Sequence, residues 1–177
     1  ERAKDADIII TSKVILSCEV LQQLPKLKLI AITATGTNNV DLDAAKELGV
    51  AVKNVTGYSA TTVPEHVLGM IFALKHSLAG WQRDQITGKW TESKQFCYFD
   101  YPITDLKGST LGVFGKGCLG TEVGRLAELL GMKVLYAEHR NATTCREGYT
   151  PFEEVLKQAD ILTLHCALTE TTKNLIN

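Results

Sequence analysis

Residues 110–140 read TLGVFGKGCLGTEVGRLAELLGMKVLYAEHR, and this stretch decides how the chain folds. An apolar run at 111–114 leads into a glycine-rich loop, GKGCLG, at 115–120. Apolar residues at helical spacing follow, Gly131 ends that pattern, and a second apolar run covers 133–137. This order predicts a strand, a tight turn, a helix and a second strand parallel to the first.

The three glycines of the loop have different expected tasks. Gly115 makes the turn, Gly117 lets the backbone approach a pyrophosphate, and Gly120 lets the helix pack on the strand. Glu138 follows the loop at about the spacing (~20 residues) expected of a carboxylate that accepts hydrogen bonds from ribose hydroxyls. The pattern predicts a dinucleotide site. The alternative is a βαβ unit that binds nothing.

The composition is that of an ordinary globular protein. Of the 177 residues 45% are apolar and 22% are charged, which is enough for a sizeable core. The net charge of −1 gives no reason to expect nucleic acid or an anionic membrane as a partner, and no apolar run approaches a membrane span. The first residues do not resemble a signal peptide. Five scattered cysteines without a CxxC motif predict free thiols in a reducing cytoplasm and no metal site.

Short apolar runs before the glycine stretch predict a second parallel sheet with helices on its faces. Runs at 6–11, 27–33 and 50–55 are expected to be strands, the first of them buried, with helical patterns between them. The polar break TGYSATT that follows is the expected domain boundary. The chain is therefore predicted to contain two α/β domains, 1–59 and 60–177.

The segments around the glycine stretch give four further expectations. A long, mostly buried helix is predicted at 63–81, because apolar residues surround its axis. Segment 81–101 is aromatic and charged without periodicity, so it either packs against another subunit or forms a surface loop. A short helix is expected at 151–158 and a buried strand at 160–166. Only three strands of the second sheet are then visible, where a full dinucleotide fold has about six, so the chain is expected to be a fragment of a longer protein.

Several motifs occur together in the order of a known family. They are TATGTNNVDLDAA, GYSATTVPEH with its helix, LKGSTLGVFGKGCLG and ADILTLHCALTETTKNLIN. In this order the chain resembles the D-isomer-specific 2-hydroxyacid dehydrogenases, and TATGTNNVD and LYAEHR look most like the glycerate dehydrogenase/hydroxypyruvate reductase branch. The resemblance implies hydride transfer between a nicotinamide cofactor and a small D-2-hydroxy acid. It also implies a partial flavodoxin-like substrate domain followed by a partial Rossmann domain.

The resemblance implies roles for residues that match the family's motifs. Thr35 and Gly36 correspond to the loop whose backbone N–H groups bind the substrate carboxylate, and the alternative is a plain strand-to-helix turn. Thr62 and Val63 correspond to positions near the nicotinamide, although Val63 is equally suited to packing in the first helical turn. In the glycine loop the expected cofactor-binding residues are Gly115, Gly117, Cys118, Leu119 and Gly120.

The resemblance also implies which dinucleotide is used. Glu138 matches the acid that accepts both ribose hydroxyls and repels a 2′-phosphate, which favours NAD over NADP. Arg140 complicates this interpretation, because a nearby arginine can pair with a 2′-phosphate. His139 and Arg140 are expected at the cofactor, and the alternative is that both are solvated loop residues.

The end of the chain contributes three more candidates. His165, Cys166 and Ala167 match the strand-end segment beside the adenine ribose and pyrophosphate, where the family usually has proline in place of Ala167.

A separate hypothesis concerns Cys118 in the glycine loop, whose thiolate can be stabilised near a helix N-terminus, so that its oxidation would block cofactor binding. The alternative is a small residue that fills a tight turn.

The expected catalytic residues lie outside the chain. The family's substrate-orienting arginine and its histidine–glutamate acid–base couple come after the segment that ends at Asn177, so no catalytic residue is named and the 177 residues alone are expected to be inactive. D-glycerate or hydroxypyruvate is the favoured substrate, and a cytoplasmic homodimer through the nucleotide domain is implied, with 81–101 as a candidate arm. The alternative from another class is a non-catalytic NAD(H)-binding sensor or corepressor.

Overall fold

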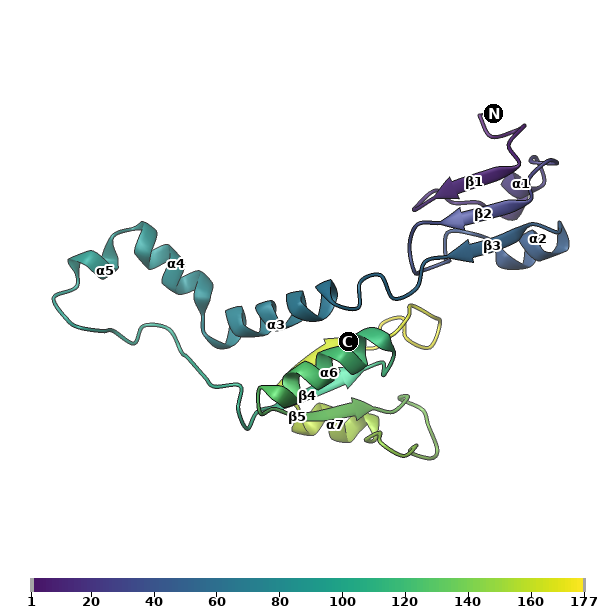
Figure 1. Ribbon diagram of the computed structural model, residues 1–177. Coiled ribbons are helices and arrows are strands. Elements are labelled where there is room, and N and C mark those ends of the chain that lie inside the picture. The colour runs from purple at the N-terminus through teal and green to yellow at the C-terminus, as the bar shows by residue number, and fades with distance from the viewer. Residues whose placement is uncertain (1, 177) are drawn as a thin grey trace. The chain divides into compact units, whose positions relative to one another are not determined.

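The computed structural model describes residues 2–176, and the chain divides into two compact units, Glu1–Tyr58 and Ser59–Asn177. Each unit contains a three-stranded parallel sheet with its own core (Figure 1). The predicted α/β class with parallel sheets is therefore confirmed. Within residues 2–176, no helix combines the length and the apolar character needed to cross a membrane.

The first unit has the strand order β1-β2-β3, and neighbouring strands are parallel. Its elements are β1 Ile8–Thr11, α1 Cys18–Leu21, β2 Leu29–Ile32, α2 Leu42–Glu47 and β3 Ala51–Asn54. Asp41 caps α2, because its side chain accepts a hydrogen bond from the backbone N–H of Ala44 at 3.0 Å. Crossover connections between parallel strands are right-handed, so two steps in the same direction place both helices on one face.

That face holds the core of the first unit, and the opposite face is open within it. Ile30 and Ile32 of β2 are buried in the same cluster as residues of α1 and α2. On the other face Ile8 and Ile10 of β1 are 56% and 73% exposed. The prediction of a buried first strand is wrong for this face, because both helices of the unit lie on the opposite one.

The second unit has the strand order β5-β4-β6, again with parallel neighbours. Its sheet and the helices that connect the strands are β4 Thr110–Phe114, α6 Cys118–Leu129, β5 Lys133–Ala137, α7 Phe152–Gln158 and β6 Ile161–Leu164. The chain steps from β4 to β5 in one direction and from β5 across β4 to β6 in the other. Right-handed crossovers then put α6 and α7 on opposite faces, as Figure 1 shows.

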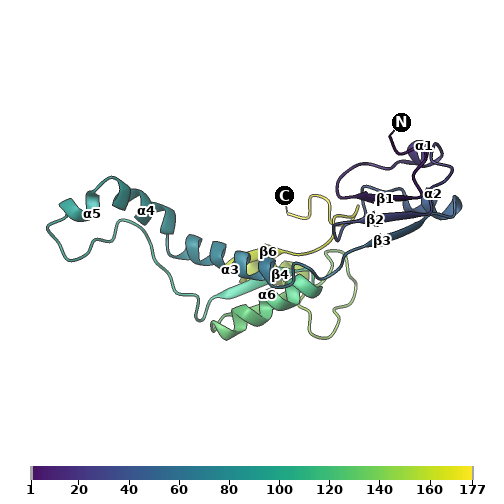
Figure 2. The same ribbon diagram turned by 45° about the horizontal axis from the view of Figure 1, so that its top comes forward.

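Both faces of the second sheet are packed. Leu111 and Val113 of β4 are fully buried against α6 and against α3 (Thr62–Lys75), which runs beside α6 (Figure 2). At the edge strand β6, Leu162 and Leu164 remain 38% and 53% exposed. The prediction of a buried last strand is wrong at these two positions, because β6 has a neighbouring strand on one side only.

The long helix predicted at 63–81 is wrong, because the chain breaks after α3. Ser77 adopts a left-handed conformation with φ of 52°, which cannot continue a right-handed helix. Two helices follow it, α4 Leu78–Ile86 and α5 Lys89–Glu92. The expected burial is also wrong for much of α3, since Leu74 is 74% exposed. The apolar residues that surround the axis of α3 therefore did not indicate that the helix is buried.

Residues 81–101, called the arm below, contain an ordered polar centre rather than a wholly irregular loop. Asp84 is only 5% exposed and accepts hydrogen bonds from the hydroxyls of Tyr101 at 2.9 Å and Tyr98 at 3.2 Å. The Lys89 ammonium lies 3.1 Å from the same carboxylate. These contacts fold the second half of the arm back onto α4 and α5.

Gly112 of β4 offers a test of the packing in the second unit. A Cβ at this glycine would lie 2.7 Å from Cγ1 of Val155 and 2.8 Å from Cδ2 of Leu162. We expect Gly112→Ala to lower the free energy of unfolding by about 1–3 kcal/mol, measured by urea denaturation. Gly69→Ala in α3 is the matched control, since nothing lies within 4 Å of its Cβ position and alanine favours a helix. Equal losses in both variants would contradict this packing.

Candidate functional site

A cavity of about 550 Å³ opens where the three strands of the second sheet end. Phe114 and Gly115 contribute from the end of β4, Ala137 and Glu138 from the end of β5, and Cys166 from the segment after β6. This volume lies within the usual range for small-molecule sites, about 300–1,000 Å³. The strand order reverses at β4, and ligands of open α/β sheets bind at the carboxyl ends of the strands beside such a reversal.

The glycine loop joins β4 to α6 beside this cavity. Gly115 has φ of 101°, and a Cβ there would lie 2.7 Å from the backbone N of Cys166, so only glycine fits. A Cβ at Gly120 would collide with the carbonyl oxygen of Gly115, and it would lie 3.2 Å from Cγ1 of Val113 on β4. The expected tasks of these two glycines, the turn and the close helix–strand contact, agree with these contacts.

Gly117 differs from its neighbours in the loop, because nothing lies within 4 Å of its Cβ position. It is the N-cap residue of α6, with extended backbone angles that any residue can adopt. The N–H groups at the start of a helix lack intrahelical partners and favour anions. Open space beside such a terminus leaves room for a phosphate group.

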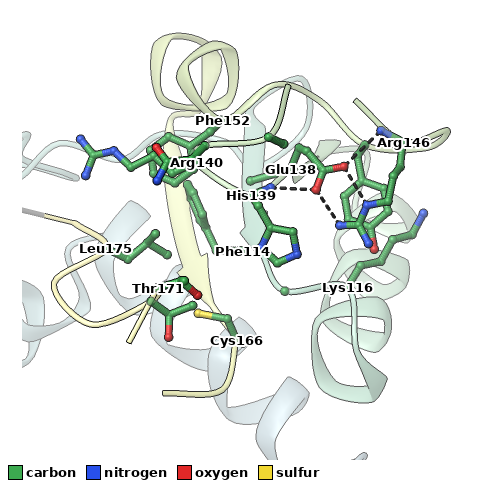
Figure 3. Close-up of a pocket in the computed structure, with 16 residues that line it drawn as sticks. Phe114, Lys116, Glu138, His139, Arg140, Arg146, Phe152, Cys166, Thr171 and Leu175 are labelled. Carbon is green, nitrogen blue, oxygen red and sulfur yellow. Dashed lines mark hydrogen bonds and ion pairs between the residues drawn. The ribbon is translucent and has the colours of Figure 1, made fainter. Parts of the chain in front are cut away.

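Glu138 forms the most tightly held charge of the cavity (Figure 3). Its side chain is 4% exposed, and Arg146 binds it with two side-chain hydrogen bonds of 2.7 Å. The backbone N–H groups of His139 and Arg146 donate to the same carboxylate at 2.8 and 3.1 Å. The Arg146 side chain, followed by the His139 N–H, lowers the pKa of Glu138 to about 2.

Arg146 reaches Glu138 because the loop after β5 returns to the sheet edge. The backbone N–H of Glu138 donates to the carbonyl of Thr150 at 2.8 Å, and the N–H of Thr150 donates to the carbonyl of Tyr136 at 2.7 Å. The Arg146 guanidinium lies 4.0 Å from the ring centroid of Tyr149, a cation–π distance. The arginine is therefore held by a carboxylate and by an aromatic ring.

Two further cations lie at the cavity. The Lys116 ammonium is 4.6 Å from the ring centroid of Tyr136, and it donates to the carbonyl of Gly148 at 3.3 Å. The Arg140 guanidinium lies over Phe152 at 5.4 Å, and Figure 3 shows it turned away from Glu138. Within residues 2–176, no group of three or more His, Cys, Asp or Glu side chains could hold a metal ion.

The structure brings together some of the predicted cofactor-binding residues and leaves others outside the cavity. Those that line it are Gly115, Glu138, His139, Arg140 and Cys166. The next group belongs to the adjacent loop and the first turn of α6: Gly117, Cys118, Leu119 and Gly120. The remaining four, none of which lines the cavity, are His165, Ala167, Thr62 and Val63.

The residues outside the cavity have identifiable contacts. The ring Nε2 of His165 lies 2.9 Å from the Thr163 hydroxyl, and burial lowers the pKa of this histidine. The carbonyl of Ala167 accepts a hydrogen bond from the hydroxyl of Thr172 at 2.6 Å. Thr62 and Val63 begin α3, the first exposed and the second half-buried.

Thr35 and Gly36 lie in the first unit, in the exposed loop after β2. The Thr35 hydroxyl donates to the carbonyl of Val55 at 3.0 Å, and the Asn54 side chain donates to the carbonyl of Thr35 at 2.7 Å. These bonds tie the loop to the end of β3. Its backbone is thus presented at the carboxyl ends of β2 and β3, the edge at which parallel sheets bind ligands.

The sequence interpretation missed several residues of the cavity. Arg146, Lys116, Tyr149, Phe152, Thr171, Thr172 and Leu175 all line it. The sequence could have identified Lys116 as a cavity residue, since it lies inside the glycine loop. No feature of the sequence identifies Arg146 as a cavity residue, because it lies in a segment without periodicity. That segment returns to β5 only through backbone pairing at Thr150.

Comparison with known proteins identifies the class of this chain. Residues 1–176 match the family described as D-isomer specific 2-hydroxyacid dehydrogenase, catalytic domain, so the chain belongs to this family. The resemblance drawn from its motifs is confirmed. Within the family it is similar to proteins named glycerate dehydrogenase and hydroxypyruvate reductase.

Three relatives illustrate the extent of the match. A Haemophilus influenzae protein with a provisional 2-hydroxyacid dehydrogenase name is 82% identical over the whole chain, which covers 56% of that protein. A glycerate dehydrogenase of Methylorubrum extorquens is 47% identical over 99% of this chain and 55% of its own length. The structure of an Aquifex aeolicus D-lactate dehydrogenase with NAD and lactic acid has a TM-score of 0.82 and 31% identity, covering 97% of this chain and 51% of that one. The chain thus spans about half the length of the curated relatives it matches.

The Glu138–Arg146 pair predicts a pH dependence of stability. The folded-state pKa of Glu138 is about 2, below its usual 4.5, so its contribution is present above about pH 4.5 and is lost as the pH falls toward 2. We expect Glu138→Gln to lower the urea midpoint near neutral pH, and the difference from wild type to shrink as the pH falls through this window. Glu122→Gln is the matched control. Glu122 pairs with Arg125 in the same bidentate way but is 33% exposed, so its replacement should lower the midpoint less. A difference that stays constant with pH would contradict the assignment.

Proposed function

We propose that this chain carries the NAD-binding part, and a part of the substrate domain, of a D-2-hydroxyacid dehydrogenase that interconverts D-glycerate and hydroxypyruvate. The observation that carries the proposal is the cavity at the reversal of strand order, with a buried carboxylate at the end of the second strand of that βαβ unit. The relative named glycerate dehydrogenase supports the choice of substrate. The domain assignment that goes with this is 1–59 for substrate and 60–177 for the dinucleotide.

The residues present fit a dinucleotide. The open space at Gly117, at the start of α6, suits the pyrophosphate, and the cavity edge at Glu138 suits the adenosine ribose. When bound, NAD supplies the acceptor of the hydride and NADH its donor. The chain's own part is to bind and orient the cofactor. The proposed contacts are Gly115, Gly117, Cys118, Leu119, Gly120, Glu138, His139, Arg140, His165, Cys166 and Ala167, with Thr62 and Val63 near the nicotinamide.

The substrate carboxylate is proposed to bind at Thr35 and Gly36. The Thr35 side chain and carbonyl are both bonded within the first unit, which fixes the loop and leaves its N–H groups as the donors for an anion. The acid–base chemistry is assigned to family residues that come after Asn177. The 177 residues are therefore proposed to bind NADH without turnover.

The assembly is proposed to be a homodimer in which the arm contacts a second copy. Phe96 and Phe99 of the arm are 97% and 89% exposed, and Ile86 is 79% exposed. Three large apolar side chains exposed on one segment support a protein partner. A cytoplasmic location is supported by five cysteines that are unpaired among the described residues.

Gly117→Ala tests the cofactor site directly. The backbone angles at Gly117 suit alanine and its Cβ would enter open space, but alanine is a poorer N-cap residue than glycine, so we expect the unfolding free energy to fall by no more than about 1 kcal/mol. The same methyl would occupy the space proposed for the pyrophosphate, so NADH binding should weaken at least about tenfold, measured by calorimetry. Gly69→Ala, which also adds a methyl in open space, should leave binding unchanged. Unaltered NADH affinity in Gly117→Ala would contradict the proposed site.

The activity is tested by extending the chain to the length of its relatives. With hydroxypyruvate and NADH, we expect absorbance at 340 nm to fall, because the reaction consumes reduced nicotinamide. The 177-residue chain should bind NADH and give no turnover. Tight NADH binding by the extended chain, without turnover of any small 2-oxo acid, would contradict the dehydrogenase proposal and favour a non-catalytic sensor.

A further inference from the structure

Arg146 and two backbone groups occupy the whole hydrogen-bonding capacity of Glu138. One carboxylate oxygen accepts from the His139 N–H and from a terminal nitrogen of Arg146, at 2.8 and 2.7 Å. The other accepts from the backbone N–H and the Nε–H of Arg146, at 3.1 and 2.7 Å. An ionised carboxylate has about four acceptor positions, so all of them are filled.

This arrangement changes how Glu138 can interact with the adenosine ribose of a dinucleotide. A carboxylate selects NAD when it accepts hydrogen bonds from the two ribose hydroxyls and repels a 2′-phosphate. Here a ribose hydroxyl must displace an arginine donor before Glu138 can accept from it. The repulsion is also weakened, because a guanidinium at 2.7 Å compensates the negative charge.

The remaining charges of the cavity have the opposite sign. Besides the Glu138–Arg146 pair, Lys116 and Arg140 line it, so the ionised side chains sum to a positive charge. Figure 3 shows Lys116 on the same side of the cavity as Arg146. The low pKa of Glu138 agrees with a carboxylate dominated by its cationic neighbour.

Arg146 also remains available to a ligand. Its side chain is 54% exposed although Glu138 is only 4% exposed, so the guanidinium covers the carboxylate from the solvent side. A guanidinium has five N–H donors, of which two bond Glu138, and its flat edge suits phosphate oxygens. Arg140 is less suited to this role, because its guanidinium lies over Phe152.

We propose that Arg146 determines the cofactor specificity of this site, so that it accepts a 2′-phosphorylated dinucleotide alongside NAD. The proposal rests on the proposed function, because it concerns the adenosine end of the same dinucleotide site. Arg146 covers the acid that would exclude the 2′-phosphate and supplies the donor that would bind it. Glu138 acts chiefly to position Arg146.

The test compares two ligands that differ only at the 2′ position. ADP-ribose and its 2′-phosphorylated form contain the adenosine and pyrophosphate without the nicotinamide, so their binding, measured by calorimetry, does not depend on substrate or turnover. The wild-type chain should bind them with dissociation constants within about tenfold of each other. Arg146→Met should weaken the 2′-phosphorylated ligand at least about tenfold and leave ADP-ribose unchanged or tighter.

Three further variants sharpen the result. Arg125→Met removes an arginine with the same bidentate geometry, from a pair on α6 that does not line the cavity, and should change neither ligand. Arg140→Met should change the ratio of the two dissociation constants less than Arg146→Met does. Glu138→Gln should tighten the 2′-phosphorylated ligand, since it frees Arg146.

The outcomes separate this proposal from the proposed function. An unchanged ratio in Arg146→Met overturns the proposal, as does a strong wild-type preference for ADP-ribose that Glu138→Gln abolishes. Equal loss of both ligands in Arg146→Met, with an unaltered melting temperature, also overturns it, because Arg146 would then act only as a support for the loop. If the wild-type chain binds neither ligand, the proposed function itself fails, and the specificity proposal fails with it.

Discussion

The reversal of strand order at β4 is the constraint on which the site depends. β4 pairs with β5 on one side and β6 on the other, and right-handed crossovers put α6 and α7 on opposite faces. The loops that leave β4 and β5 therefore diverge, and a cavity remains between them. The first unit, with its order β1-β2-β3, has no such reversal, and both of its helices cover one face.

Of the charges at this cavity, Lys116 belongs to the glycine motif, whereas Glu138, Arg140 and Arg146 lie outside it. The motif fixes the backbone, through the contact of Gly120 with Gly115 and the close approach of Gly115 to Cys166. The proposed choice between NAD and its 2′-phosphorylated form depends on the loop after β5, where Glu138 follows the strand and Arg146 returns to bond it. A site of this kind can keep its dinucleotide fold while one side chain changes whether it accepts a 2′-phosphate on the adenosine ribose.

Much of the fold could be predicted from the sequence, because its signals were local. The strand–loop–helix–strand order, the helix end at Gly131 and the acid at 138 all lie within one stretch, and β4, α6 and β5 form there. The break at Ser77 could not be predicted, since a serine carries no signal for positive φ. The exposure of Ile8 and Ile10 could not either, because an unbroken apolar run does not say how many faces are covered. Arg146 was missed because its contact with Glu138 depends on tertiary pairing at Thr150.

The response of individual N–H groups to NADH tests the proposed cofactor site most directly. In a ¹H–¹⁵N NMR titration of the 177-residue chain, the dinucleotide site predicts the largest shifts at the backbone N–H groups of Gly117 and Cys118 and at the Nε–H of Arg146. The N–H groups of the Thr35 loop and of the arm should shift little, because neither is proposed to contact the adenosine or the pyrophosphate of NADH. Shifts confined to the arm or to the first unit, with Gly117 and Arg146 unmoved, would show that the cavity beside β4 does not hold the cofactor.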